Sequence, residues 1–133
     1  MPTQRSYSTG GGFPNHFERG DDWEEVNFPP VDLPNAEGSI WAPGGTAAEM
    51  YHVWFYLCEY GGGARTVTLG RDYGSGGALG AGEYWLNTFA VAANGNIDWT
   101  GPFQVRGNDD IRGHDGGAGG NVVSIHLRIK RIW

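Results

Sequence analysis

The chain has 133 residues, of which 39% are hydrophobic and 18% charged, a length that fits one domain with one core. Its net charge of −6 argues against nonspecific nucleic-acid binding, which needs clustered lysine and arginine. No apolar run reaches the roughly eighteen residues of a membrane-spanning helix, so we expect neither a nucleic-acid nor a membrane partner.

Residues 1–48 are expected to form an extended, acidic arm rich in proline and glycine. Residues 1–50 hold eight Asp or Glu and two Arg, which accounts for the whole excess charge. The prolines argue against a helix or a central strand. The arm is too aromatic for a freely solvated segment, so we expect it to pack on its own domain or on a neighbouring subunit. Its expected contact residues are Phe13, Phe17, Trp23, Phe28 and Trp41.

Residues 49–133 are expected to form a β-sandwich domain. Residues 51–58 are apolar on both alternating faces, which predicts a central strand. The glycines at 61–63 then predict a hairpin to a strand at residues 66–69. A further strand is predicted at residues 83–92, after a glycine-rich loop.

Asn94-Gly95 favours a type I′ turn, since both residues tolerate a positive φ. This turn predicts that residues 97–99 pair back onto residues 89–92, and that the strand continues through residues 103–105 after a bulge at Gly101-Pro102.

Residues 122–130 alternate strictly between apolar and polar side chains, which predicts a strand with one buried face. Strand patterns at roughly ten-residue spacing, without a helical pattern, indicate an all-β fold. The expected fold is therefore an antiparallel β-sandwich or jelly roll with an extended N-terminal arm.

Polar groups crowd together between Arg106 and Asp115 and in the glycine-rich segment that follows. Carboxylate and amide oxygens are ligands that calcium prefers, but the spacing matches no EF-hand. The candidate calcium ligands are Asp109, Asp110, Asp115 and Asn121. The simpler interpretation is a glycine-rich connection with solvated charges, and no cofactor is required by the pattern.

The sequence contains no residue pattern that strongly indicates a catalytic site. Cys58, the single cysteine, lies inside an apolar strand, where a thiol is usually inert. Glu59 and Glu83 are candidates for glycoside hydrolysis only because they lie at strand ends, where carboxylates also cap edges or pair with arginine. We therefore expect a protein that is not an enzyme.

Two binding functions remain. The basic residues Arg128, Lys130 and Arg131 in the last strand complement the acidic arm, which favours a homo-oligomer. The combination of small sandwich, glycine-rich loops and arm resembles the accessory structural proteins of phage particles, such as capsid decoration, spike or tail components. The resemblance implies a virion location and other particle proteins as partners.

The alternative is a carbohydrate-binding β-sandwich, with or without calcium in its binding site, located on a cell surface or outside the cell. Tryptophans on a β face can stack sugar rings. The expected ligand-binding residues are Trp54, Trp85, Trp99 and Asn108. Tryptophan on an alternating strand also packs commonly into the core, so both interpretations stay open.

Overall fold

The structure, a computed structural model, describes residues 23–116 and 122–133. In these residues the chain forms eight strands, one short 3-10 turn, η1 (Tyr73–Ser75), and no α-helix. The described residues therefore contain no helix that is long and apolar enough to span a membrane. The predicted all-β class is confirmed.

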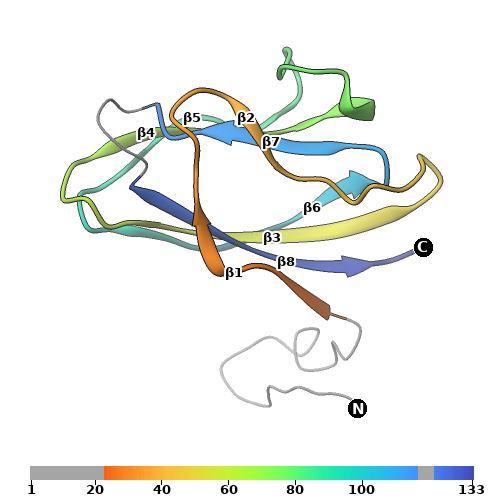
Figure 1. Ribbon diagram of the computed structural model, residues 1–133, viewed down its shortest axis with the longest axis horizontal. Helices are drawn as coiled ribbons and strands as arrows, with labels where there is room; N and C mark the ends of the chain where they lie inside the picture. Colours follow the sequence, from red (N-terminus) through yellow and green to blue (C-terminus); the bar gives the residue numbers. More distant parts are fainter. Residues whose placement is uncertain (1–22, 117–121) are drawn as a thin grey trace.

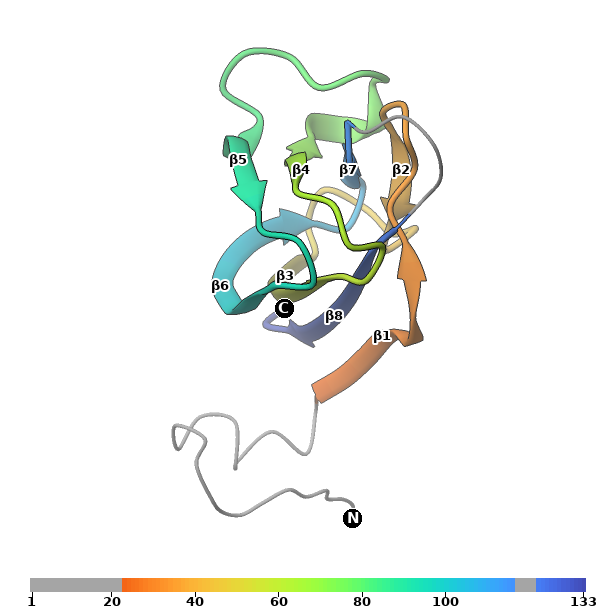
Figure 2. The same cartoon turned by 90° about the vertical axis from the view of Figure 1, so that its left-hand side faces the viewer.

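The strands form two antiparallel sheets that pack face to face (Figures 1 and 2). Sheet A has the order β1 (Trp23–Asp32), β8 (Val123–Arg131), β3 (Met50–Glu59) and β6 (Asn96–Arg106). Sheet B has the order β2 (Gly38–Trp41), β7 (Asp110–His114), β4 (Arg65–Asp72) and β5 (Tyr84–Val91). Consecutive strands change sheet at every step except between β4 and β5. This connectivity is that of a jelly roll, and the predicted antiparallel sandwich is confirmed.

The core lies between the sheets and follows from the alternation of side chains along each strand. On β8, Val123, Ile125, Leu127 and Ile129 are at most 2% exposed, while the residues between them are partly exposed. Burying an aliphatic side chain of this size contributes roughly 1.5–3 kcal/mol. The alternation predicted for the last strand is therefore confirmed.

β3 is a central strand, as predicted. It pairs with β8 in unbroken register from Tyr51 opposite Arg131 to Glu59 opposite Val123, and with β6 on its other side. The inward side chain of Phe55 is fully buried. The outward side chains of β3 are also apolar in sequence, and the burial pattern leaves several of them partly exposed. Aromatic groups consequently reach the outer surface of sheet A.

Two predicted hairpins are wrong. The turn at residues 61–63 connects β3 of sheet A to β4 of sheet B, and Asn94-Gly95 connects β5 of sheet B to β6 of sheet A. The chain does turn here, but the predicted type I′ turn is wrong. The Gly95 amide donates a hydrogen bond of 2.9 Å to the Ala92 carbonyl, which places Ala93 and Asn94 at the centre of the turn, and Asn94 has a positive φ of 55° whereas Gly95 does not. A local turn sequence fixes the reversal of the chain but not the strand with which the chain then pairs.

The predicted bulge in β6 is confirmed. The register with β3 shifts between the pair Val53–Phe103 and the pair Phe55–Thr100, so the two residues Gly101-Pro102 of β6 lie opposite the single residue Trp54 of β3. Gly101 has a φ of +146°, and a Cβ there would lie 2.6 Å from the Val53 carbonyl oxygen. Only glycine fits this close approach.

The described part of the expected arm, residues 23–48, contributes one strand to each sheet. β1 pairs with β8, and β2 pairs with β7. Pro29 and Pro30 fall where the register of β1 shifts, between Val26 and Val31, and an edge strand tolerates proline at such a point. The acidic residue Glu25 lies opposite Arg128. Along β1, the acidic arm therefore pairs with the basic last strand of its own chain.

Each edge strand of the two described sheets is irregular. The register shifts once along β1, once along β2, twice along β5 and twice along β6. The inner pairs β3–β8 and β4–β7 have no such shift. Bulges at sheet edges discourage pairing with strands of other chains. The edges are accordingly poor surfaces for regular strand-to-strand assembly.

Candidate functional site

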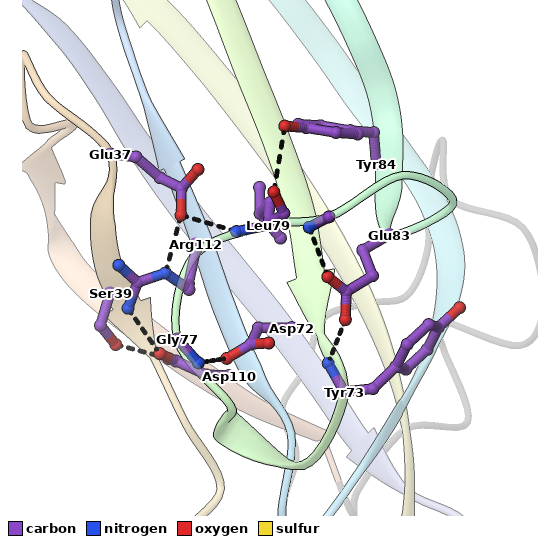
Figure 3. Close-up of polar contacts among 11 residues, drawn as sticks. Glu37, Ser39, Asp72, Tyr73, Gly77, Leu79, Glu83, Tyr84, Asp110 and Arg112 are labelled. Atoms are coloured by element: carbon purple, nitrogen blue, oxygen red, sulfur yellow. Dashed lines mark hydrogen bonds and ion pairs between the residues drawn. The ribbon is translucent and has the colours of Figure 1, made fainter.

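Carboxylates fasten the glycine-rich loop at residues 73–83 to the outer side of sheet B (Figure 3). Glu83 accepts hydrogen bonds from the Tyr73 amide at 2.7 Å and the Gly80 amide at 2.6 Å. Asp72, at the end of β4, accepts one from the Gly77 amide at 2.7 Å. Each acidic group thus satisfies backbone donors that the loop, lacking regular structure, would otherwise leave unpaired.

The middle of this loop is held by an ion pair between Glu37 and Arg112 of β7. Glu37, just before β2, accepts hydrogen bonds from the Leu79 amide at 2.9 Å and from Arg112 Nε at 3.0 Å. Arg112 also donates to Asp110 at 3.2 Å, and Asp110 accepts a further bond from Ser39 (Figure 3). The arginine therefore joins β2, β7 and the loop in one network.

Leu79 covers the one position of β4 that has no side chain. It is 8% exposed, and a Cβ at Gly70 would lie 2.9 Å from both of its terminal methyl groups. The same Cβ would lie 2.5 Å from the Glu83 carbonyl oxygen. Gly70 therefore creates the space in which the loop packs on the sheet.

The pKa values of the charged groups around this loop are shifted by their hydrogen bonds. Burial would raise the pKa of Glu37, but the hydrogen bonds from Arg112 and the Leu79 amide outweigh it, so the pKa is lowered. The amides of Tyr73 and Gly80 lower the pKa of Glu83. The hydrogen bond with Glu37 raises the pKa of Arg112. These groups are therefore held in their charged forms, which suits structural anchors rather than proton donors.

Glu59, the other predicted catalytic candidate, joins two turns. Its side chain is 1% exposed and accepts hydrogen bonds from the amides of Asn94 at 2.6 Å, Gly61 at 2.8 Å, Gly62 at 3.2 Å and Gly63 at 3.5 Å. The Asn94 amide is the largest cause that lowers the pKa of Glu59. A carboxylate fixed in this way organises the turns after β3 and β5.

The calcium candidates in the described residues serve similar purposes. Asp109 is 2% exposed and accepts hydrogen bonds from the amides of Gly74 at 2.9 Å and Arg106 at 2.8 Å. Asp115 is fully buried and accepts one from Asn35 at 3.3 Å. No group of three or more metal-ligating His, Cys, Asp or Glu side chains occurs in residues 23–116 and 122–133. Asn121 lies outside the described residues.

The three tryptophans proposed for sugar stacking do not all lie on one side of a sheet, because Trp54, opposite Arg128, and Trp99 are on the outer side of sheet A and Trp85 is not. Trp54 is 6% exposed on β3. Trp85 lies between the sheets, stacked at a centroid distance of 4.7 Å on Phe103, which in turn stacks on Phe55. Trp99 lies on the other side of sheet A. Asn108, the polar residue predicted with them, is partly buried in the turn between β6 and β7.

Four side chains form what we call the aromatic face, on the outer side of sheet A: Tyr56, Trp99, His126 and Arg128. All four are partly exposed. The Trp99 ring lies 5.7 Å from that of Tyr56 and 5.1 Å from that of His126, between centroids. The Arg128 guanidinium lies 4.5 Å above the Trp99 ring, a cation–π contact.

The sequence named two of these four residues, Trp99 and Arg128, and missed the others. Tyr56 lies directly opposite His126 in the β3–β8 register. Both residues could have been found from the alternation of side chains along β3 and β8, which places them on the outward-facing side of each strand. That alternation identifies a shared surface only once the two strands are known to be neighbours. The aromatic face is therefore a product of nonlocal pairing.

The remaining predicted partner residues are distributed as follows. Phe13 and Phe17 lie outside the described residues, while the backbones of Trp23 and Phe28 lie in β1. Trp41 packs edge-on against Tyr51 at 6.3 Å between centroids. Lys130 projects from the outer side of β8, and the more exposed Arg131 lies 3.7 Å from Glu49 in an ion pair. Lys130 thus lies on the same outer side of β8 as Arg128 of the aromatic face.

No protein-family model matches the chain, and no curated protein matches it significantly. One solved structure is similar, from work described as "Bacillus endospore appendages form a novel family of disulfide-linked pili". The similarity covers 97% of this chain and 96% of that chain, with 18% sequence identity and a TM-score of 0.49. A likeness this distant says nothing of what the chain does.

Proposed function

We propose that the chain is a non-enzymatic structural protein that forms homo-oligomers through its N-terminal arm. The observation that carries the proposal is the aromatic face. Its rings and guanidinium are only partly buried on the outer side of the sandwich. Partly exposed aromatic and arginine side chains in contact with one another are typical of protein interfaces.

The use of the acidic groups supports a structural role. Glu59 and Glu83, the two carboxylates considered for catalysis, each accept at least two backbone hydrogen bonds. A general acid needs a raised pKa, whereas the pKa of each of these groups is lowered. Both groups bind backbone amides of nearby turns and loops, and Glu59 also binds the Asn94 amide of the turn after β5.

The irregular sheet edges favour assembly through an arm and a face over assembly through strand edges. Residues 1–22 precede β1 and, when extended at about 3.3 Å per residue, can reach about 70 Å. A ten-residue strand such as β3 spans only about 33 Å at the same rise. The arm is therefore long enough to contact a neighbouring molecule.

We make two proposals, a broader and a narrower one, for the kind of assembly that contains this subunit. The broader proposal is an extracellular or surface-assembled structure. The narrower one, from the sequence, is an accessory component of a virion, such as a capsid decoration, spike or tail protein. Immunogold labelling of purified particles and of intact cells separates the two, because a virion component labels particles and a surface subunit labels cells.

Light scattering after size exclusion tests oligomer formation. We expect the full chain to elute as an oligomer and a variant lacking residues 1–22 to elute as a folded monomer. The deletion stops before Trp23, the first residue of β1, so the described strands are retained. A full chain that stays monomeric at concentrations near 1 mM, or a shortened chain with the same oligomeric mass, contradicts the proposal.

A further inference from the structure

We infer that Asn94 is a site of spontaneous deamidation, and that the Glu59 carboxylate slows the reaction by holding the turn between β5 and β6 closed. The inference is independent of the proposed function, because it concerns the chemistry of one turn and not the assembly of the chain. The observations that carry it are the residue that follows Asn94, the exposure of the Asn94 side chain and the hydrogen bonds of the turn.

Asn94 is the only asparagine in the sequence that is followed by a glycine. Glycine has no Cβ, so its backbone bends freely and its amide nitrogen is open to close approach. That nitrogen is the nucleophile that attacks the side-chain amide of the preceding asparagine. The Asn94 side chain is exposed, so water and base reach the reacting atoms. The dipeptide therefore has the residue types and the access that deamidation needs.

The reaction consumes water and releases ammonia. The Gly95 amide loses its proton to base from the solvent, and its nitrogen bonds to Cγ of Asn94. The bond from Cγ to the side-chain nitrogen then breaks, and that nitrogen takes up a proton and leaves as ammonia. Water opens the resulting cyclic imide at one of its two carbonyl carbons. Opening at Cγ gives aspartate, and opening at the backbone carbonyl gives isoaspartate, in which the main chain runs through the former side chain.

Three hydrogen bonds hold the backbone groups that this reaction must move. The Gly95 amide, which is the nucleophile, donates to the Ala92 carbonyl at 2.9 Å. The Asn94 amide donates to the Glu59 carboxylate at 2.6 Å, and the Glu59 amide donates to the Gly95 carbonyl at 2.9 Å. Ring closure needs a free Gly95 amide and a rotation of the Asn94 backbone, so the turn has to open first. The closed turn therefore reacts slowly.

Glu59 is placed to control how often the turn opens. Its side chain is 1% exposed and also accepts hydrogen bonds from the amides of residues 61–63, which fix the carboxylate at the end of β3. A carboxylate accepts hydrogen bonds that are about twice as strong as those of a neutral amide. Glu59→Gln should therefore raise the open fraction of the turn, and with it the rate of deamidation, roughly tenfold.

Isoaspartate is the product that disturbs the fold. It adds a carbon atom to the main chain between the Asn94 amide and the Gly95 carbonyl, which are the two groups that join this turn to Glu59. The spacing of these groups then no longer matches their partners on β3. We expect protein that carries isoaspartate at this position to melt at a lower temperature than unmodified protein.

Peptide mapping by mass spectrometry tests the inference on the full chain. Samples are kept at neutral pH, either folded or in denaturant, and the conversion of each asparagine is followed with time. We expect Asn94 to convert fastest of all the asparagines in denaturant and much more slowly in the folded chain. A folded chain in which Asn94 converts as fast as in denaturant, or another asparagine that converts faster than Asn94 in denaturant, overturns the inference.

Glu59→Gln tests the role of the carboxylate, and Glu83→Gln is the matched control. Glu83 also accepts backbone hydrogen bonds, but from the amides of Tyr73 and Gly80 in another loop. Folded Glu59→Gln should convert Asn94 faster than the wild type, whereas folded Glu83→Gln should not. Equal rates in wild type and Glu59→Gln, or equal acceleration in both variants, overturns the role of Glu59.

Hydrogen exchange in the wild type gives a second measurement, which needs no variant to fold. The amides of Asn94 and Gly95 should be protected in the folded chain, because both are donors in the closed turn. Random-coil exchange at these two amides in a folded sample overturns the inference, since a turn that is open cannot slow the reaction.

Discussion

At the scale of single residues, the carboxylates of this chain act mainly on backbone amides. Glu59, Glu83, Asp72 and Asp109 each accept at least one hydrogen bond from a glycine-rich turn or loop. Glycine allows these turns to form but adds no side chain to hold them. The acidic residues supply the missing contacts, which explains how so many glycines are compatible with ordered loops.

Glu59→Gln should lower the melting temperature at pH 7, because the amide holds the four backbone donors less strongly than a carboxylate does. The folded-state pKa of Glu59 is lowered, so its contribution to stability is present above the unfolded pKa and is lost as pH falls through the folded pKa. The difference between the two proteins should therefore shrink as melting curves are taken from pH 7 towards pH 3.

Glu49→Gln is the control for this prediction, since the Glu49 side chain forms a surface ion pair with the 58% exposed Arg131 and its backbone hydrogen bonds are unaffected by the change. Its melting temperature should change little. Equal melting temperatures of the wild type and Glu59→Gln at pH 7 would show that the carboxylate does not stabilise the two turns.

At the scale of elements, patterns within one strand were predictable and relations between strands were not. The alternation at residues 122–130 and the apolar run at residues 51–58 identified β8 and β3, because burial repeats with the period of the strand. Asn94-Gly95 identified a turn but not that it crosses between sheets. The link from Glu59 to Asn94 spans 35 residues, and no local pattern reports it.

The strands hidden within the expected arm show a second limit. Pro29 and Pro30 argue against a regular central strand, and β1 is an edge strand with its irregularity at that place. The two prolines therefore correctly indicated a break in strand pairing at this point. They did not indicate that the residues on either side pair with β8 and form a strand. The aromatic face was likewise invisible until β3 and β8 were neighbours.

The Asn94 turn allows a test of its backbone. Asn94→Ala should destabilise the fold by roughly 1 kcal/mol, because alanine tolerates the φ of +55° less well than asparagine does. Asn94→Gly should be neutral or slightly stabilising. Chemical denaturation of the three proteins measures the difference, and an alanine variant as stable as the glycine variant would refute the explanation.

The loop at residues 73–83 can be tested through the position on which Leu79 packs. Gly70→Ala should cost about 1–3 kcal/mol in the free energy of unfolding, since its Cβ would meet the Leu79 side chain and the Glu83 carbonyl. Gly63→Ala is the matched control, because nothing lies within 4 Å of a Cβ at that turn position. Faster amide exchange at residues 77–80 in Gly70→Ala alone would locate the effect in the loop, and equal unfolding free energies would contradict it.

At the scale of the whole molecule, the sandwich has two different outer sides. Sheet B is covered near Gly70 by a loop that Glu37, Asp72 and Glu83 fasten. Sheet A carries partly exposed rings and cations, and its edges are irregular. This asymmetry leaves one side suited to contact with another chain, which is the basis of the proposed assembly.

Hydrogen exchange of the intact chain tests this central claim most directly. We predict that backbone amides of residues 7–17 exchange slowly at a concentration where the protein is oligomeric, and at random-coil rates after dilution to the monomer. The described core strands should stay protected in both samples. Random-coil exchange of residues 7–17 in a sample whose measured mass is that of an oligomer would contradict assembly through the arm.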